Sequence, residues 1–367
     1  MTESPPQVFA LIAGGGTGGH VYPALALAQA LVARGHAPEE LRFVGARRGL
    51  EATVVPEAGF AIELLPGRGL QRRLSWENVR TARDTAAAVN QAVRIVRRLR
   101  PQVVVGVGGY ASFPCVLAAR MLRVPTVVHE QNAAPGVVNR LAAGLGARVA
   151  ISLPGTPLPH AVVTGNPIRA EVAAVAREPE LSPRALFVAI GGSLGARTIN
   201  DTALGLYERW RDRTDIAIRH ICGPRNLDDC TTRLARLRRP TDALHYELVG
   251  YETDVPGLYS RAALLLGRAG AVTVAELAAA GVPAILVPLP GAPGDHQGAN
   301  ARALVDAGAA ILEPDAQCNA TTVAAIVDEL LADPARLAVM GAAARTLARP
   351  DATDRLADLV EEVARVA

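Results

Sequence analysis

A run of five glycines, one threonine and one histidine, Gly14-Gly15-Gly16-Thr17-Gly18-Gly19-His20, follows the apolar stretch at residues 8–13. An Ala- and Leu-rich helical pattern comes after it. A strand, a tight glycine turn and a helix in this order expose backbone N–H groups at a helix N-terminus, which suits a phosphate or pyrophosphate. Gly14, Gly16 and Gly19 also satisfy the G-x-G-x-x-G pattern, so a dinucleotide site is the first hypothesis to test.

A dinucleotide-binding unit carries an acidic residue at the end of its second strand, where the carboxylate binds the ribose. The expected second strand, residues 41–45, runs into Ala46-Arg47-Arg48, and the next acid is Glu51. An NAD-dependent enzyme is therefore disfavoured.

Apolar runs that suit strands alternate with helical patterns, which predicts an α/β protein with doubly wound parallel sheets. The first helix is expected at about residues 23–33. The expected strands are residues 8–13, 41–45, 103–107, 124–129, the region of 149, 162–163, 185–190, 216–222, 244–249, 263–266 and 284–287.

The pattern restarts after the polar stretch around Gly165-Asn166-Pro167, because the apolar run at 185–190 leads into a second glycine turn. A chain of 367 residues is long enough for two domains. We therefore expect two Rossmann-like domains facing a cleft, at residues 1–165 and 166–350. A final helix at about 351–367 is expected to pack back onto the first domain.

Composition narrows the class of protein. Half of the residues are hydrophobic, and the four cysteines are scattered without a C-x-x-C pair, which argues against a zinc ribbon and is typical of a reducing cytoplasm. The first seven residues do not resemble a signal peptide, and no apolar run reaches the ~18–20 residues of a spanning helix. We expect a soluble or peripheral protein.

Ligands of open parallel sheets bind at the carboxyl ends of the strands. Six polar or glycine-rich clusters occupy such positions here, at residues 14–20, 108–112, 129–132, 191–197, 267–276 and 290–297. One glycine turn alone is a weak signal. Clusters in both halves of the chain are a stronger one, because they can converge on a single cleft.

Six motifs together resemble the MurG family, glycosyltransferase family 28, in order and spacing over nearly the whole chain. They are Gly15-Gly16-Thr17-Gly18-Gly19-His20, Gly108-Gly109-Tyr110-Ala111-Ser112, His129-Glu130-Gln131-Asn132, Gly165-Asn166-Pro167, Gly191-Gly192-Ser193 and Gly270-Ala271-Val272-Thr273-Val274-Ala275-Glu276.

The resemblance implies the GT-B fold and an inverting hexosyltransferase of peptidoglycan synthesis. Such an enzyme moves GlcNAc from UDP-GlcNAc to the MurNAc of undecaprenyl-pyrophosphoryl-MurNAc-pentapeptide (lipid I), and the products are lipid II and UDP. The family uses UDP-GlcNAc as a substrate and needs no cofactor and no bound metal. Nucleic acid is not expected as a partner, whereas cell-wall and division proteins are.

The resemblance also implies a set of donor-binding residues. Gly192 and Ser193 would present backbone N–H groups to the UDP pyrophosphate, and Glu276 would accept hydrogen bonds from the ribose. For Glu276 the alternative is an acid favoured only by the helix dipole, and for Arg169 it is a linker salt bridge. The remaining donor contacts implied are Thr17, Gly18, Gly19, Asn132, Arg169, Arg268, Ala271, Val272, Thr273, Val274, Ala275, His296 and Gln297.

His20 is the candidate general base for the acceptor hydroxyl. An unperturbed imidazole titrates near pH 6.5 and can take a proton at neutral pH. Glu130 and His129 are the rivals for this role. The alternative for His20 is a helix-start residue that only binds the acceptor phosphate. Tyr110 and Ser112 are expected on the acceptor side.

An excess of arginine marks the first half of the chain. Residues 1–165 hold 17 arginines and nine acidic residues, whereas residues 166–367 hold 21 arginines and 26 acidic residues. Arginines beside exposed apolar groups suit an anionic membrane surface. We therefore expect a docking surface for the cytoplasmic face of the cell membrane, built from Arg72, Arg73, Leu74, Trp76 and Arg80. The alternative is a solvated helix with Trp76 in the core.

Three positions depart from the family pattern: Leu194 stands where Gln is usual, Ala269 where Ser is usual, and Glu252 where an apolar residue is usual beside the uracil. They put single donor contacts in doubt. The alternative functions are another GT-B enzyme, namely a glycolipid glycosyltransferase or a UDP-GlcNAc 2-epimerase, and a non-catalytic scaffold that binds nucleotide sugars.

Overall fold

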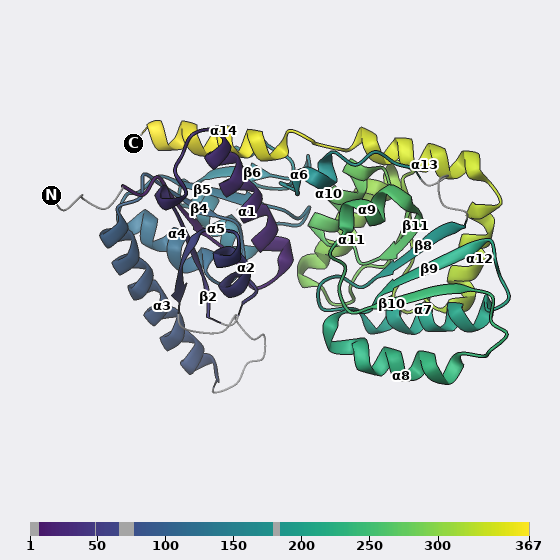
Figure 1. Ribbon diagram of the computed structural model, residues 1–367. Coiled ribbons are helices and arrows are strands. Elements are labelled where there is room, and N and C mark those ends of the chain that lie inside the picture. Colours follow the sequence, from purple (N-terminus) through teal and green to yellow (C-terminus); the bar gives the residue numbers. More distant parts are fainter. Residues whose placement is uncertain (1–6, 48, 66–76, 179–183, 367) are drawn as a thin grey trace. The chain divides into compact units, whose positions relative to one another are not determined.

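The computed structural model describes residues 7–47, 49–65, 77–178 and 184–366, and for residues 77–84 it describes the backbone alone. The chain forms two compact units (Figure 1). Unit 1 comprises Met1–Arg169 and Asp351–Ala367, and unit 2 comprises Ala170–Pro350. The first division falls after Arg169 rather than after Gly165, so Arg169 belongs to unit 1.

Seven parallel strands form one sheet in the described part of unit 1, in the order β3-β2-β1-β4-β5-β6-β7. Their bounds are β1 Ala10–Ala13, β2 Leu41–Ala46, β3 Ala61–Leu65, β4 Val103–Gly106, β5 Thr126–Glu130, β6 Arg148–Ile151 and β7 Val162–Val163. In the register of the sheet, Ala13 at the end of β1 pairs with Gly106 at the end of β4. The glycine turns that follow these two strands therefore leave the sheet side by side.

Helices cover both faces of this sheet. They are α1 Gly18–Ala33, α2 Glu51–Glu57, α3 Glu77–Leu99, α4 Ser112–Met121, α5 Val137–Gly144 and α14 Ala352–Arg365. Successive residues of a strand point to opposite faces. Accordingly, Leu11 packs in a core with residues of α3 and α4, whereas the neighbouring Ile12 packs in a core with residues of α1 and α14.

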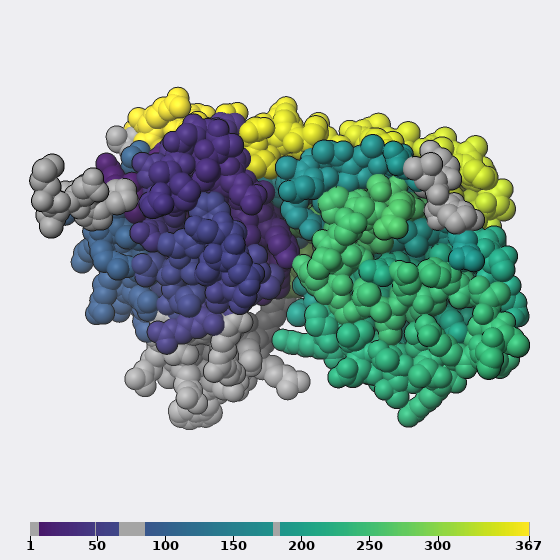
Figure 2. Space-filling view, in the orientation of Figure 1, coloured from purple at the N-terminus to yellow at the C-terminus, as the bar shows by residue number. Residues whose placement is uncertain are grey.

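The last helix, α14, lies against α1 (Figures 1 and 2). Leu356 and Val360 are fully buried in the core shared with α1. Beside them, Arg34 Nη1 donates to Asp358 Oδ1 at 2.5 Å. The C-terminal segment is thus an integral part of unit 1, although unit 2 separates it from the rest of that unit in the sequence.

Unit 2 has a six-stranded parallel sheet in its described part, in the order β10-β9-β8-β11-β12-β13. The strands are β8 Ala185–Ile190, β9 Ile216–Ile221, β10 His245–Val249, β11 Ala262–Gly267, β12 Ala284–Leu286 and β13 Ala310–Leu312. The helices are α6 Ala170–Ala173, α7 Arg197–Arg209, α8 Leu227–Leu237, α9 Val255–Arg261, α10 Ala271–Ala280, α11 His296–Asp306, α12 Ala320–Leu331 and α13 Pro334–Thr346.

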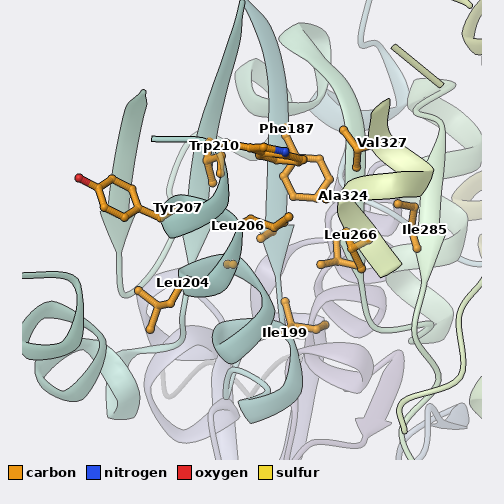
Figure 3. Packing of buried hydrophobic residues seen from close by; sticks show 14 of the residues in the cluster. Phe187, Ile199, Leu204, Leu206, Tyr207, Trp210, Leu266, Ile285, Ala324 and Val327 are labelled. Atoms are coloured by element: carbon orange, nitrogen blue, oxygen red, sulfur yellow. The ribbon is translucent and has the colours of Figure 1, made fainter. Parts of the chain in front are cut away.

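Large apolar side chains fill the space between this sheet and α7 and α12 (Figure 3). Phe187 from β8 meets the edge of Trp210 with ring centroids 5.9 Å apart and an interplanar angle of 88°, an arrangement that aromatic pairs favour. Leu206 and Val327 are fully buried in the same cluster. This core fixes the sheet of unit 2, in which a glycine turn follows β8.

The structure differs from the sequence prediction at three elements. The edge strands β3 and β13 were not among the expected strands; β3 is partly exposed and β13 has only three residues. Helix α1 begins at Gly18 and includes Pro23. His20 therefore lies in the first turn of α1 and not in the loop before it.

Candidate functional site

The first glycine turn of unit 1, at residues 14–16, is held by hydrogen bonds to Val44 and Glu51. Gly15 and Gly16 have φ of 148° and 92°, values that favour glycine. The N–H of Gly14 donates to the Val44 carbonyl at 3.1 Å. The N–H of Gly16 donates to the carboxylate of Glu51, 2.7 Å from Oε2. That N–H is therefore directed at a protein anion and not at a phosphate.

His20 lies between the two glycine turns of unit 1. Its Nδ1 is 3.4 Å from Thr17 Oγ1. Its ring packs against the second turn so closely that a Cβ at Gly108 would come within 2.8 Å of Nε2. The two turns also touch each other, because a Cβ at Gly109 would lie 2.1 Å from the carbonyl oxygen of Gly15. The imidazole is half-buried and keeps access to solvent.

The second glycine turn of unit 1, at residues 108–109, lies beside Gln131 and Ser112. Gln131 Nε2 donates to the Val107 carbonyl at 2.7 Å. Tyr110 is half-buried, whereas Ser112, the first residue of α4, is fully buried. The Ser112 hydroxyl would meet a Cβ at Gly106 at 2.6 Å. Of the two residues expected on the acceptor side, Tyr110 alone is at the surface.

His129 is enclosed in the protein. Its Nε2 lies 2.9 Å from the Gly165 carbonyl, which can only accept, so Nε2 carries the proton. Burial lowers the pKa of this imidazole, because desolvation disfavours the charged form. Ser152 Oγ is 3.3 Å from the same nitrogen. His129 connects β5 to the strand ends beside it and is not exposed to a substrate.

Glu130 organises the loop that follows β5. Its buried carboxylate accepts hydrogen bonds from Asn132, Gly136 and Asn139, with the Gly136 N–H and Asn139 Nδ2 each 2.8 Å from Oε2. Asn132 donates to Oε1 through both its backbone N–H and its side-chain amide. Of the three candidate bases, His20 alone is half-exposed.

Arg169 is the last residue of unit 1, and its guanidinium carbon lies 5.6 Å from the centre of the Tyr22 ring, a cation–π contact. The structure thus places this predicted donor-binding arginine beside α1.

The glycine turn of unit 2 joins β8 to α7. Gly192 and Gly195 have φ of 85° and 75°, and the Gly195 N–H closes the turn by donating to the Gly192 carbonyl at 2.9 Å. A Cβ at Gly195 would lie 2.0 Å from the carbonyl oxygen of Cys222. Ser193 and Leu194 are exposed at the tip of the turn. A backbone hydrogen bond thus closes the turn, and Ser193 in the segment expected to bind pyrophosphate faces solvent.

Helix α10 begins directly after Gly270, and its first three residues, Ala271, Val272 and Thr273, are half-buried. Val274 is buried and Ala275 half-buried. Glu276 lies on the inner side of α10 and accepts a hydrogen bond from the Tyr259 hydroxyl at 3.1 Å. The N-terminus of this helix carries a partial positive charge that favours anions.

Arg268 supports the loop that follows β12. Its Nη1 donates to the carbonyls of Val287 and Pro288 at 3.1 and 3.2 Å, and to Asp315 Oδ1 at 2.6 Å. Thr198 from α7 donates to the other oxygen of Asp315. The half-buried guanidinium therefore connects α7, the end of β11 and the loop.

The loop after β12 ends at His296 and Gln297. Gln297 Oε1 accepts the N–H of Leu289 at 2.9 Å, and His296 Nδ1 lies 2.9 Å from the Pro293 carbonyl. Both side chains are half-buried. They fix the shape of the loop in which they lie.

Glu252 has a structural partner that explains its presence in a site expected to be apolar. Arg219 Nε and Nη2 reach Glu252 Oε2 at 2.9 and 2.8 Å. The other carboxylate oxygen accepts the N–H of Asp254 at 3.0 Å. The charge is thus neutralised within unit 2.

Four side chains with a part in these sites were missed by the sequence analysis: Glu51, Tyr259, Arg219 and Asp315. Each has a site partner far away in the chain: Gly16 for Glu51, Glu276 for Tyr259, Glu252 for Arg219 and Arg268 for Asp315, at separations of 17 to 47 residues. Of the four, only Glu51 could have been suspected from nearby residues, because Gly45 and Gly49 precede it closely in the sequence and leave space for its side chain.

Several expected features fall outside what the structure describes. Arg72, Arg73, Leu74 and Trp76 lie outside the described residues, and of Arg80 the backbone in α3 alone is described. In the described ranges, His, Cys, Asp and Glu side chains nowhere gather in threes as a metal site requires. None of the described helices combines the length and the apolar character needed to cross a membrane.

Comparison with known proteins adds the family. Residues 10–151 match the glycosyltransferase family 28 N-terminal domain, and residues 186–356 match its C-terminal domain. Two curated relatives are named UDP-N-acetylglucosamine–N-acetylmuramyl-(pentapeptide) pyrophosphoryl-undecaprenol N-acetylglucosamine transferase. The one from Halorhodospira halophila is 43% identical and the one from Desulforudis audaxviator 37% identical, and each match covers 96% of this chain and 98% of the relative.

A solved structure of Acinetobacter baumannii MurG is similar over 97% of this chain and 99% of that one, with a TM-score of 0.76 and 30% identity. The sequence matches and this likeness extend over both parallel-sheet units. The chain therefore belongs to glycosyltransferase family 28 and has the GT-B fold.

Proposed function

We propose that this protein is an inverting N-acetylglucosaminyltransferase that moves GlcNAc from UDP-GlcNAc to the MurNAc of lipid I, with lipid II and UDP as products. The observation that carries the proposal is that both units keep their strand-end groups. Unit 1 has a half-exposed imidazole between two glycine turns, and unit 2 has a glycine turn closed by a backbone hydrogen bond and a helix N-terminus near a carboxylate. A scaffold that only binds nucleotide sugars would need the groups of unit 2 and not the imidazole of unit 1.

The donor binds to unit 2 in this proposal. The N–H groups of Gly192 and Ser193 and the first turn of α10 supply partial positive charge for the pyrophosphate. Glu276 is fixed by Tyr259 and accepts hydrogen bonds from the ribose hydroxyls. Arg268 acts by holding the loop of His296 and Gln297, which bind the sugar.

His20 takes the proton of the acceptor hydroxyl. With Nδ1–H donated to Thr17 Oγ1, the lone pair on Nε2 receives the proton as the MurNAc C4 oxygen bonds to C1 of GlcNAc. The bond between C1 and the phosphate oxygen breaks on the opposite face, and UDP leaves with the electron pair. The positive ends of the unit 2 helices stabilise the charge that develops on the leaving group.

The acceptor is a membrane lipid, so we propose that unit 1 docks on an anionic membrane surface. Besides the segment at 72–80, a cavity of about 420 Å³ supports this, because Arg120, Arg123 and Leu145 line it. Met121 beside it is 61% exposed and Leu141 is 51% exposed. Arginines interleaved with exposed apolar groups favour an anionic lipid interface. Proteins of the cell wall and of division are the proposed protein partners.

Vesicle sedimentation tests the docking surface. Charge reversal at Arg72, Arg73 and Arg80 should abolish binding to vesicles that contain phosphatidylglycerol, since each basic residue near such a surface is worth about 1 kcal/mol. The matched control reverses three exposed arginines of unit 2, Arg209, Arg236 and Arg239. Equal binding by the two triple variants would refute the surface.

The reaction itself is tested by UDP release from UDP-GlcNAc with and without a lipid I analogue. The proposal predicts release only when acceptor is present, together with a GlcNAc-MurNAc product. Conversion of UDP-GlcNAc to UDP-N-acetylmannosamine without acceptor would indicate an epimerase. Binding of UDP-GlcNAc without any turnover would indicate a scaffold.

A further inference from the structure

The carboxylate of Glu51 lies directly beneath the first glycine turn. Its side chain is 2% exposed, and each oxygen accepts one backbone N–H: Oε2 from Gly16 at 2.7 Å and Oε1 from Ala46 at 2.8 Å. Glu51 begins α2, so the carboxylate connects this helix, the end of β2 and the turn after β1.

Three glycines make room for this carboxylate. A Cβ at Gly15 would lie 2.2 Å from Glu51 Oε1, one at Gly49 would lie 2.1 Å from Oε2, and one at Gly45 would lie 2.3 Å from Cγ. A side chain at any of these positions would displace the carboxylate. The space is therefore shaped for the side chain of Glu51, and the two N–H donors that face it favour a carboxylate.

The position of Gly16 bears directly on His20. Gly16 precedes Thr17, whose hydroxyl lies 3.4 Å from His20 Nδ1, and Thr17 is the N-cap of α1. Thr17 makes no side-chain capping bond to its own helix. The hydrogen bond from Gly16 to Glu51 thus fixes the chain immediately before the group that orients the imidazole.

We propose that Glu51 is a positioning residue for the transfer reaction: it holds Gly16, and through Thr17 it sets where His20 meets the acceptor hydroxyl. This inference rests on the proposed function, with His20 as the base. It assigns the N–H of Gly16 to the protein's own carboxylate, so the acceptor pyrophosphate is bound by other groups.

The isosteric variant Glu51→Gln tests the proposal. A glutamine has one oxygen for two N–H donors, and its NH₂ would face one of them, so the turn must shift. Because displacement of a catalytic group by about 1 Å costs on the order of 10²-fold, kcat should fall about 10- to 100-fold. The Kd for UDP, whose proposed binding groups all lie in unit 2, should stay unchanged. Glu57→Gln, at the exposed end of the same helix, is the control and should behave like the wild type.

A double-mutant cycle of Glu51→Gln and His20→Ala separates a positioning role of Glu51 from a general loss of structure. If Glu51 acts through His20, Glu51→Gln lowers kcat in the wild type but has little further effect in His20→Ala. Equal losses in both backgrounds would overturn the proposal, and so would a wild-type kcat in Glu51→Gln. If Glu51→Gln fails to fold, Gly49→Ala serves instead, because it moves the carboxylate and keeps its charge.

Hydrogen exchange gives a readout that does not depend on activity. Gly16 is an exposed residue whose N–H is bonded to Glu51, so exchange in a peptide covering residues 14–20 should be faster in Glu51→Gln. Unchanged exchange overturns the assignment of Glu51 whatever the activity. If exchange is faster in Glu51→Gln but the wild type shows no GlcNAc transfer, the proposed function has failed, whereas the role of Glu51 in holding Gly16 stands.

Discussion

The imidazole of His20 rests on Gly108: a Cβ at Gly108 would lie 2.7 Å from His20 Cδ2 and 2.8 Å from Nε2. Gly108 follows β4 and His20 follows β1, and the two strands are neighbours in the sheet. The absence of a side chain at position 108 is what allows the ring to stay in place. The second glycine motif of the chain therefore contributes to the position of the candidate base.

Replacement of Gly108 by alanine should consequently lower kcat. The new methyl group would push the imidazole away, and φ of +92° adds a backbone cost of about 1 kcal/mol for a non-glycine residue. We expect a fall in kcat on the order of 10²-fold with an unchanged Kd for UDP by calorimetry. Gly59→Ala is a matched control, because Gly59 has φ of +86° and no atom within 4 Å of a Cβ. Similar losses of kcat in both variants would contradict the role of the His20 contact.

Removal of the Glu276 carboxylate should weaken donor binding. A hydrogen bond to a charged group is worth about 1.5–3 kcal/mol, so Glu276→Ala should raise the KM for UDP-GlcNAc about 10- to 100-fold. Tyr259→Phe removes the hydroxyl that fixes Glu276 and should raise KM less. Steady-state kinetics with varied UDP-GlcNAc measure the KM of both variants. A KM that Glu276→Ala leaves unchanged would show that the acid serves α10 and not the ribose.

Unit 2 should lose stability as the pH falls from 6.5 towards 4. His220 is buried, its Nε2–H donates to Asn200 Oδ1 at 3.0 Å and its Nδ1 accepts from the Tyr246 hydroxyl at 2.8 Å, an arrangement that suits the neutral ring. Burial lowers the pKa of His220 to about 4. Below pH 6.5 the unfolded chain binds a proton that the folded unit does not, which costs about 1.4 kcal/mol per pH unit until the folded pKa is reached.

Urea unfolding followed by Trp210 fluorescence, in a Trp76→Phe background, measures this pH dependence in unit 2. The free energy of unfolding should decrease from pH 7 to pH 5, and His220→Gln should flatten the slope. His245→Gln is the control, because His245 is exposed. A slope that the two variants share equally would assign the pH dependence to other groups.

The sequence predicts most of the strand ends in both sheets, but it does not predict the long-range hydrogen bonds that support the loops after these strands. The apolar run at 185–190 coincides with β8, because a buried parallel strand is apolar on both faces and the glycine turn marks its end. The edge strand β3 lacks this signature, since Glu63 interrupts it and its residues before Leu65 are at least partly exposed.

The candidate site shows the same division. The glycine motifs and His20 are visible as local patterns, whereas the bond between Gly16 and Glu51 joins residues 35 positions apart. Likewise, nothing local distinguishes the half-exposed His20 from the enclosed His129, since burial is a property of the folded sheet. Periodicity gives the elements, and the tertiary structure decides which polar groups remain accessible.

The most direct test of the account compares the wild type with His20→Ala in a transfer assay, with UDP-GlcNAc and a lipid I analogue both saturating. His160→Ala, an exposed histidine of unit 1, is the control. If His20 is the base, kcat falls about 10²- to 10⁴-fold while the Kd for UDP-GlcNAc stays at the wild-type value. A kcat close to that of the wild type would contradict the account.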